Sequence, residues 1–442
     1  MMQPSASEPP TLTPALTPVL ATSHPKTMGR VLFVLAGNSI AMFLGLIGTV
    51  WTMRVLGPEQ FGIVSVSLVI LYAAWQFTGK GLDQTAVRLA AITDQPRGAA
   101  AIFETVFALK LVGNGALLLL GALLAGPLTR WLLGGDTSPV PVLIGFLGAT
   151  AASFWGFHSS AIQAESQFQR YAPVQVANNA LKLLALALII LSGVLTATTA
   201  MITSLVGFFG AAAIAFLLAP NYARRAGWTR EAVAPVLRYA RWLVISSILF
   251  VLYSRLDLLM VSRMVGGKTV GVYAAAALLA QMADLIAGSI LTVFLPRFSR
   301  HTHTAPLRDQ VRASLRCSLL FAVPLIPGYF LIEPVMKLLL FLIGPSYAGA
   351  VPFLKMMYFG VLFTMVTYPL HVLYYARGKP QIVTALDTFM LLFNAAGLYW
   401  GITRYGAYGA AVIVLVSRIL AGTLLSIGVI TNLGIGRKPT GE

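Results

Sequence analysis

The sequence has few charged residues and a single cysteine, and each shortage excludes a class of protein. Only 10% of its 442 residues are charged, whereas a soluble domain carries about 25%, so most of the chain cannot be soluble. One cysteine, Cys317, excludes any internal disulfide. The 14 acidic residues and 5 histidines are mostly scattered, and the chain has no nucleotide-binding, zinc-protease or serine-hydrolase motif. We therefore expect no enzyme, no metal centre and no cofactor.

Apolar residues make up 57% of the chain and fall into long runs. Runs of about 20 residues recur from Val31 onward, each long enough to cross roughly 30 Å of hydrocarbon as a helix. The sequence thus predicts an all-α polytopic membrane protein of about twelve transmembrane helices. We place the spans at residues 31–53, 63–86, 101–125, 140–162, 172–194, 197–219, 239–262, 271–294, 312–333, 351–375, 382–403 and 406–432.

A polar turn between the first two runs, Arg54-Val-Leu-Gly-Pro-Glu-Gln-Phe-Gly62, recurs 209 positions later in the chain. The same offset matches five pairs, namely Arg54 and Arg263, Gly57 and Gly266, Gly62 and Gly271, Gly79 and Gly288, and Arg88 and Arg297. Such a repeat indicates that the protein consists of two homologous halves, each a set of membrane spans. In membrane carriers, repeated halves usually enclose a substrate path. We therefore predict two repeated six-helix bundles around a central cavity.

The loop charges predict the boundaries and the orientation of these bundles. With the spans above, 19 Lys and Arg residues lie in loops on the side of the termini and 7 on the other side. The positive-inside rule then places both termini in the cytoplasm, and a net charge of +17 spread over short loops does not indicate nucleic acid. We predict a disordered tail at 1–27, bundles at 28–220 and 236–434, a basic connector at 221–235 and a cytoplasmic tail at 435–442.

Ten charged residues fall inside the predicted spans, where each costs about 2.5–3.5 kcal/mol at mid-membrane unless it pairs or meets water. They are Lys80, Lys110, Lys182, Arg255, Arg418, Asp83, Glu104, Asp257, Asp284 and Asp387. Lys80 and Asp83 are one turn apart, and a simple pair explains them. Arg255 and Asp257 lie about 200° apart around a helix and cannot pair with each other. For the deeper residues, an interhelical pair and a substrate or ion role stay equally open.

The first turn, followed by Gly81-Leu-Asp-Gln-Thr-Ala-Val-Arg88, resembles the bacterial polysaccharide transporter family. Three later segments extend the resemblance, Tyr253-Ser-Arg-Leu-Asp257, Gly271-Val-Tyr-Ala-Ala-Ala276 and Tyr405-Gly-Ala-Tyr-Gly-Ala-Ala411. The members of this family are the Wzx-type flippases, which belong to a superfamily that also contains multidrug extruders and lipid II flippases. The resemblance implies two bundles that open alternately to each side of the bacterial inner membrane. It also implies an undecaprenyl-pyrophosphate-linked oligosaccharide as substrate, moved to the periplasmic leaflet for surface polysaccharide synthesis (O-antigen, capsule or exopolysaccharide).

These observations give a set of candidate residues. Substrate binding is assigned to the cations Arg255, Lys80, Arg54 and Lys182, and coupling to H⁺ or Na⁺ is assigned to the carboxylates Asp257, Asp284 and Asp83. The expected partners are the lipid-linked oligosaccharide, membrane lipids, and the polymerase and other assembly enzymes. Two alternatives stay open: an ion-coupled multidrug/toxin extruder of the same architecture, and a membrane glycan polymerase or ligase.

Overall fold

The computed structural model describes residues 25–93, 96–165, 167–228, 230–282, 284, 307–376 and 380–432. All regular structure in these ranges is helical. The long helices are α1 (Pro25–Thr78), α2 (Lys80–Ala91), α3 (Pro96–Leu133), α4 (Val140–Ala164), α5 (Phe168–Leu191), α6 (Ala197–Leu218), α7 (Arg230–Met264), α9 (Leu307–Ile343), α10 (Ala350–Ala376) and α11 (Pro380–Asn432). Short 3₁₀ helices are η1 (Asn221–Arg224) and η2 (Pro345–Tyr347), and residues 267–282 form a further helix.

Nine helices in the described ranges are long and apolar enough to cross a membrane, which confirms the predicted class of all-helical membrane protein. Most of the two predicted tails, and the repeat positions Gly288 and Arg297, lie outside those ranges. Two of the nine are double-length, spanning 56 residues over Ala36–Ala91 and 44 over Ala385–Gly428. At about 1.5 Å per residue, each is long enough to cross the hydrocarbon twice.

Both double-length helices break at a glycine with a positive φ. Gly57 interrupts α1 with φ 69°, and Gly406 interrupts α11 with φ 58°. An L-residue with a side chain rarely adopts such a φ, which glycine reaches without steric cost. The two predicted spans on either side of each glycine are therefore joined by a turn of almost no length.

Positive-φ glycines recur in the same order in each half of the chain. In the first half, Gly57, Gly134 and Gly193 follow the first segment of α1, then α3, then α5. In the second half, Gly266, Gly344 and Gly406 follow α7, α9 and the first segment of α11. Gly57 and Gly266, matched by the 209-residue offset, have nearly the same φ, 69° and 67°. We refer to these six turns together as the glycine end.

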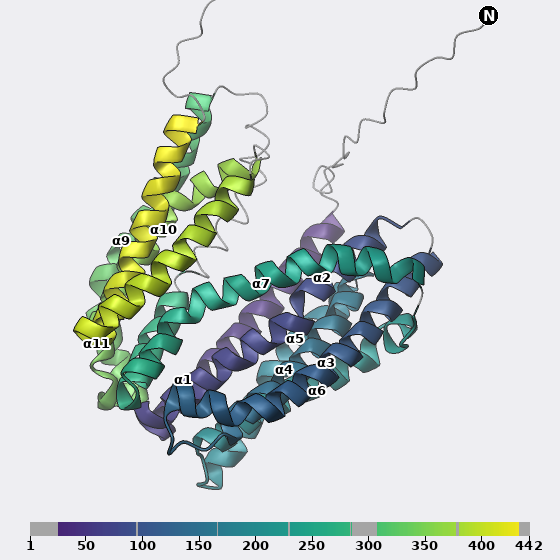
Figure 1. Ribbon diagram of the computed structural model, residues 1–442, viewed down its shortest axis with the longest axis horizontal. Helices are drawn as coiled ribbons and strands as arrows, with labels where there is room; N and C mark the ends of the chain where they lie inside the picture. Colours follow the sequence, from purple (N-terminus) through teal and green to yellow (C-terminus); the bar gives the residue numbers. More distant parts are fainter. Residues whose placement is uncertain are drawn as a thin grey trace, which may run out of the picture.

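The two halves of the chain meet at the glycine end. A Cβ on Gly271 would lie 1.8 Å from the carbonyl oxygen of Pro58, and a Cβ on Gly62 would lie 3.0 Å from the Gly271 amide nitrogen. One hydrophobic core surrounds this contact and includes Phe61 from the first half with Tyr347 from the second. From there, α9, α10 and α11 separate from the N-terminal helices toward the other end (Figure 1).

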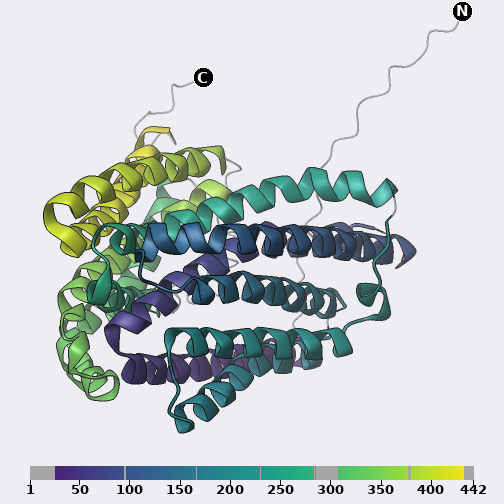
Figure 2. The same ribbon diagram turned by 60° about the horizontal axis from the view of Figure 1, so that its bottom comes forward.

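Helix α7 belongs to both halves. Its Val236 and Ala240 are buried in a second core formed by the N-terminal helices, whereas Leu258 and Val261 are buried in the core at the glycine end. Figure 2 shows this helix running the length of the molecule along the N-terminal helices. Helix α7 begins at Arg230, inside the range 221–235 predicted as the connector. Its buried Val236 and Ala240 pack the start of the helix onto the first half.

Candidate functional site

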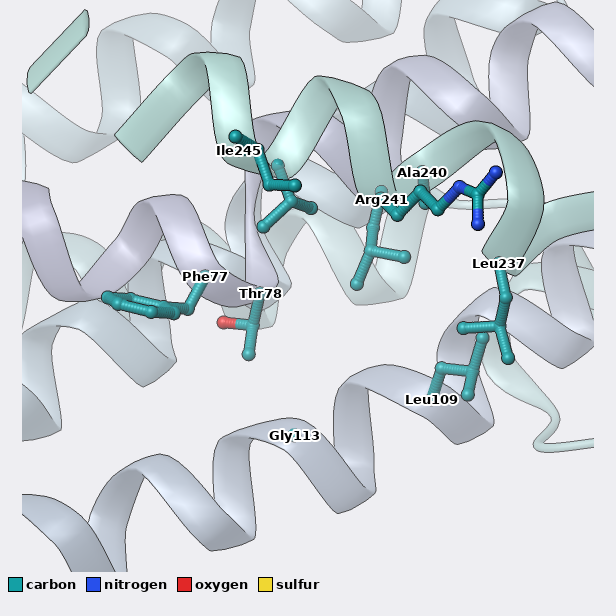
Figure 3. A pocket seen from close by; sticks show the side chains of 10 residues that line it. Phe77, Thr78, Leu109, Gly113, Leu237, Ala240, Arg241 and Ile245 are labelled. Carbon is teal, nitrogen blue, oxygen red and sulfur yellow. The ribbon is translucent and has the colours of Figure 1, made fainter. Parts of the chain in front are cut away.

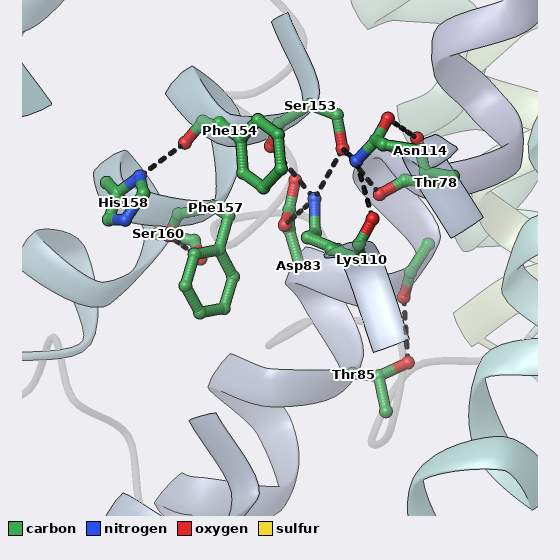
Figure 4. A network of polar contacts seen from close by, with 11 residues as sticks. Thr78, Asp83, Thr85, Lys110, Asn114, Ser153, Phe154, Phe157, His158 and Ser160 are labelled. Atoms are coloured by element: carbon green, nitrogen blue, oxygen red, sulfur yellow. Dashed lines mark hydrogen bonds and ion pairs between the residues drawn. The ribbon is translucent and has the colours of Figure 1, made fainter. Parts of the chain in front are cut away.

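A buried ion pair lies where α1 gives way to α2. Lys110 Nζ on α3 lies 2.8 Å from Asp83 Oδ1 on α2, and the Lys110 side chain is fully buried. The same ammonium donates to the Ser153 carbonyl oxygen and hydroxyl at 2.9 and 3.1 Å. Figure 4 shows Lys110 of α3, Asp83 of α2 and Ser153 of α4 converging. Asp83 is therefore paired with a lysine on another helix, and not with Lys80.

Around this pair, a hydrogen-bond network stabilises the break in the helix. The Ser153 hydroxyl donates to the carbonyl oxygen of Thr78, the last residue of α1, at 2.9 Å. The Thr78 hydroxyl donates to the Asn114 side chain at 2.9 Å, and the Asn114 amide donates to Ser153 Oγ at 3.2 Å. A helix break leaves backbone carbonyls without partners, and these side chains supply a partner for one of them. We call Thr78, Asp83, Lys110, Asn114 and Ser153 the break network.

A second ion pair lies in the C-terminal half. The Arg418 guanidinium on α11 donates to both oxygens of Asp284, at 2.8 and 2.7 Å. Both side chains are about a quarter to a third exposed. Such bidentate pairs are among the stronger polar contacts in proteins. Asp284, predicted as an ion-coupling carboxylate, is thus already neutralised by an arginine.

Arg255 and Asp257, two positions apart on α7, have different partners. Arg255 Nη2 donates to the Gln281 side chain at 2.6 Å, and Asp257 Oδ2 accepts from the Tyr273 hydroxyl at 2.8 Å. Among the described residues, no carboxylate lies within ion-pair distance of Arg255 and no cation within that distance of Asp257.

The remaining predicted cations lie apart from Arg255. Lys80 is exposed at the start of α2, and Lys182 is half-buried against Gly207 of α6. Arg54 is exposed at the glycine end, where Nη1 donates to the Phe341 and Leu342 carbonyl oxygens at 2.7 and 2.9 Å. The structure thus pairs Asp83 with Lys110 and Asp284 with Arg418, but among the described residues it gathers no single cluster of all the predicted side chains.

The Arg54 contact joins the two halves, and it has a counterpart related by the repeat. Arg54 donates to the last carbonyls of α9, whereas the Ser262 hydroxyl of α7 donates to the Leu132 carbonyl oxygen near the end of α3, at 2.7 Å. Leu132 and Phe341 are themselves 209 positions apart. A cation at a helix C-terminus offsets the negative end of its dipole.

We expect Arg54→Ala to weaken the glycine end. The variant removes two hydrogen bonds from a charged donor, and because the site is exposed we expect a loss of about 1 kcal/mol in the free energy of unfolding. Thermal unfolding in detergent measures the effect. Arg130→Ala is the control, since Arg130 is an exposed arginine in the last turn of α3. Equal stability of the two variants would remove Arg54 from the contact between the halves.

Sequence reasoning missed most of the break network. The sequence places Lys110 and Asp83 inside predicted spans, but it does not single out Thr78, Asn114 or Ser153. A partial signal was present, because Asn114 stands one helical turn after Lys110 and donates to its carbonyl oxygen at 2.9 Å. Ser153 lies on a separate helix, and no local pattern relates it to Lys110.

Comparisons with known proteins support the family resemblance. Residues 29–302 match the family described as "Polysaccharide biosynthesis protein". The chain is 23% identical over 413 residues to the Lipopolysaccharide biosynthesis protein WzxC of Escherichia coli (strain K12), covering 91% of this chain and 80% of that protein.

Two solved structures have the same fold. The lipid II flippase MurJ, in an inward closed conformation, aligns with a TM-score of 0.74 at 16% identity, covering 91% of this chain and 88% of that one. An inward-facing multidrug resistance MATE family transporter aligns with a TM-score of 0.72 at 13% identity, covering 93% and 99%.

Proposed function

Since the chain belongs to the polysaccharide biosynthesis family of membrane transporters, we propose that it is a flippase for undecaprenyl-pyrophosphate-linked oligosaccharides. It moves the repeat unit from the cytoplasmic to the periplasmic leaflet of the inner membrane, with both termini in the cytoplasm. We propose twelve crossings, six in each half: two by each double-length helix, one by each of the other seven candidate spans, and one by the helix that begins at residue 267.

Alternating access between two halves is the mechanism that this arrangement supports. The glycine end is closed by the contact of Gly62 with Gly271, while the helices of the two halves separate toward the opposite end (Figure 1). With the termini in the cytoplasm, this conformation faces inward. Breaking the contacts at the glycine end and bringing the opposite ends together opens the path outward, as repeated halves do in carriers.

Arg255 is the observation that carries the proposal. It is half-buried, and about 12 Å of helix separates it from Arg263 at the closed glycine end. Within the described part of the chain, its guanidinium donates one hydrogen bond, to the neutral side-chain amide of Gln281, and a guanidinium has five N–H donors in a planar fork. The group therefore keeps its charge and most of its donors for an oxyanion. Arginine binds phosphate groups bidentately, which suits the pyrophosphate of the substrate.

The three predicted ion-coupling carboxylates differ in how far they are neutralised. Asp83 pairs with Lys110 and Asp284 with Arg418, so binding H⁺ or Na⁺ at either one first requires its cation to leave. Asp257 accepts a hydrogen bond from the neutral Tyr273 hydroxyl instead. Of the three, Asp257 is the carboxylate we propose for ion coupling.

The experiment compares Arg255→Ala with the wild type in proteoliposomes that contain an undecaprenyl-pyrophosphate oligosaccharide. A membrane-impermeant probe follows the exposure of the glycan in each leaflet. We expect transport to fall by about 10–100-fold, since a hydrogen bond to a charged group contributes about 1.5–3 kcal/mol. Arg263→Ala is the control, because Arg263 lies on the same helix but is exposed at the glycine end.

Each result has a defined meaning. Loss of transport in Arg255→Ala alone supports both the flippase and the pyrophosphate contact. Transport that survives in this variant supports the flippase but excludes Arg255 as the pyrophosphate contact. No transport by the wild type, with several glycans and with and without an ion gradient, favours the multidrug extruder. Elongation of the glycan by the purified protein favours the polymerase.

A further inference from the structure

A mostly apolar groove of about 400 Å³ lies between α3 and α7, above the break between α1 and α2 (Figure 3). Its volume falls within the range of about 300–1,000 Å³ that is typical of small-molecule sites. Of its ten lining residues, Arg241 is the one with a charged side chain.

Two glycines shape this groove. A Cβ on Gly81 would lie 2.8 Å from the Val244 amide nitrogen, so its absence allows α7 to cross close over α2 and form one wall. A Cβ on Gly113 would lie 3.0 Å from Thr78 Cγ2, so glycine leaves space over the floor. The Thr78 hydroxyl already donates to Asn114. The floor therefore presents mainly carbon to the groove and lies directly on the break network.

The groove is open to a lipid from its rim. Leu237 and Ile245 on α7 are 47% and 48% exposed, although both are apolar. Arg241 lies between them in the sequence. A helix from Arg241 to Gly266 is about 38 Å long, and this length exceeds the thickness of the hydrocarbon. Arg241 therefore lies near the membrane surface opposite the glycine end. The adjacent Trp242 is 63% exposed, and the Arg241 guanidinium lies 5.2 Å from its ring centre. Tryptophan is enriched at that depth.

The groove thus combines an apolar channel with a cation at the level of the headgroups. We propose that it binds the polyprenyl chain of the lipid substrate, with Arg241 contacting the pyrophosphate at the membrane surface before this group reaches Arg255. This inference rests on the proposed function and adds a binding site for the lipid part of the substrate. The chain remains in hydrocarbon beside α7, while the polar head reaches the space between the two halves.

Site-specific photocrosslinking tests the assignment without any transport step. A benzoylphenylalanine replaces Ile245 in the groove or, as the control, Val112, which is 70% exposed on α3. The full-length protein is placed in nanodiscs with undecaprenyl phosphate, which has no glycan, or with phosphatidylglycerol. We expect crosslinks to undecaprenyl phosphate from position 245 in clear excess over position 112, and Arg241→Gln reduces them by about fivefold. Arg238→Gln, three positions away and exposed, leaves them unchanged.

The outcomes separate this site from the function it serves. Equal crosslinking of phosphatidylglycerol, or equal yields from the two positions, overturns the proposal and makes the groove part of the ordinary lipid annulus. If the crosslink fails but transport is intact, the groove does not bind the polyprenyl chain, and the proposed flippase function stands. If the crosslink is specific but the protein transports no glycan, the groove binds the lipid, and the flippase function is excluded.

Discussion

Gly271→Val is expected to abolish transport, because the closed glycine end cannot form with a side chain at this position. A Cβ would lie 1.8 Å from the Pro58 carbonyl oxygen, and this oxygen belongs to the backbone and has no rotamer by which to move away. Overpacking of this kind costs about 1–3 kcal/mol or more, and 1.4 kcal/mol is a tenfold change in an equilibrium. We therefore expect the closed population to fall by about fivefold or more.

Cysteine labelling measures this change directly. Replacing Cys317, the single cysteine, with serine allows a reporter at Val270, which is 2% exposed at the same contact. The labelling rate of Val270→Cys is expected to rise in the Gly271→Val background. Gly115→Val is the control, because a Cβ on Gly115 meets nothing within 4 Å. Unchanged labelling and transport in Gly271→Val, with a monodisperse protein, would exclude the Gly62–Gly271 contact as a gate.

Lys110→Met is expected to produce the largest loss of stability among these variants. The substitution leaves the Asp83 carboxylate buried without its cation, and breaking a buried pair in this way costs about 3–5 kcal/mol. Ser153 also loses the ammonium that donates to it at 2.9 and 3.1 Å. Thermal unfolding in detergent should show the loss, and the double variant Lys110→Met/Asp83→Leu should recover much of it, because it removes both charges.

The chain offers a matched control for this pair. Lys355 and Glu333 also form an ion pair, but their side chains are 34% and 60% exposed. Exposed pairs contribute little to stability, so Lys355→Met should change the unfolding temperature only slightly. If Lys110→Met were no more destabilising than Lys355→Met, the break network would have no role in holding α1 and α2 in place.

The sequence predicts the helical membrane class and the turns at Gly57 and Gly266 because both depend on local chemistry. An apolar run reports the thickness of the membrane it crosses, and a tight reversal between two such runs requires a residue that tolerates positive φ. The offset between Gly57 and Gly266 could therefore be found by inspection, and their φ values agree. The contact between Gly62 and Gly271 could not, because it joins two segments that lie far apart in the chain.

The partners of the buried charged residues could not be predicted from the sequence, for a related reason. Helical geometry excludes a pair between Arg255 and Asp257, since it depends on spacing along one helix. Choosing Lys110 for Asp83, or Arg418 for Asp284, requires knowing which faces of different helices meet. Lys80 was the nearer candidate for Asp83, but the break before α2 leaves Lys80 exposed while Asp83 is buried against α3.

The position of α7 in both cores decides how the halves can move. A continuous helix of 35 residues joins them, so the boundary between the moving bodies falls within that helix and not at the loop before it. Any reorientation must bend α7 or slide one of its faces. Cutting the chain between η1 and α7 would therefore not free two independent pieces. The second fragment would still carry the part of α7 that completes the core of the first. Helix α7 is therefore fixed in one core near its start and in the other core near its end.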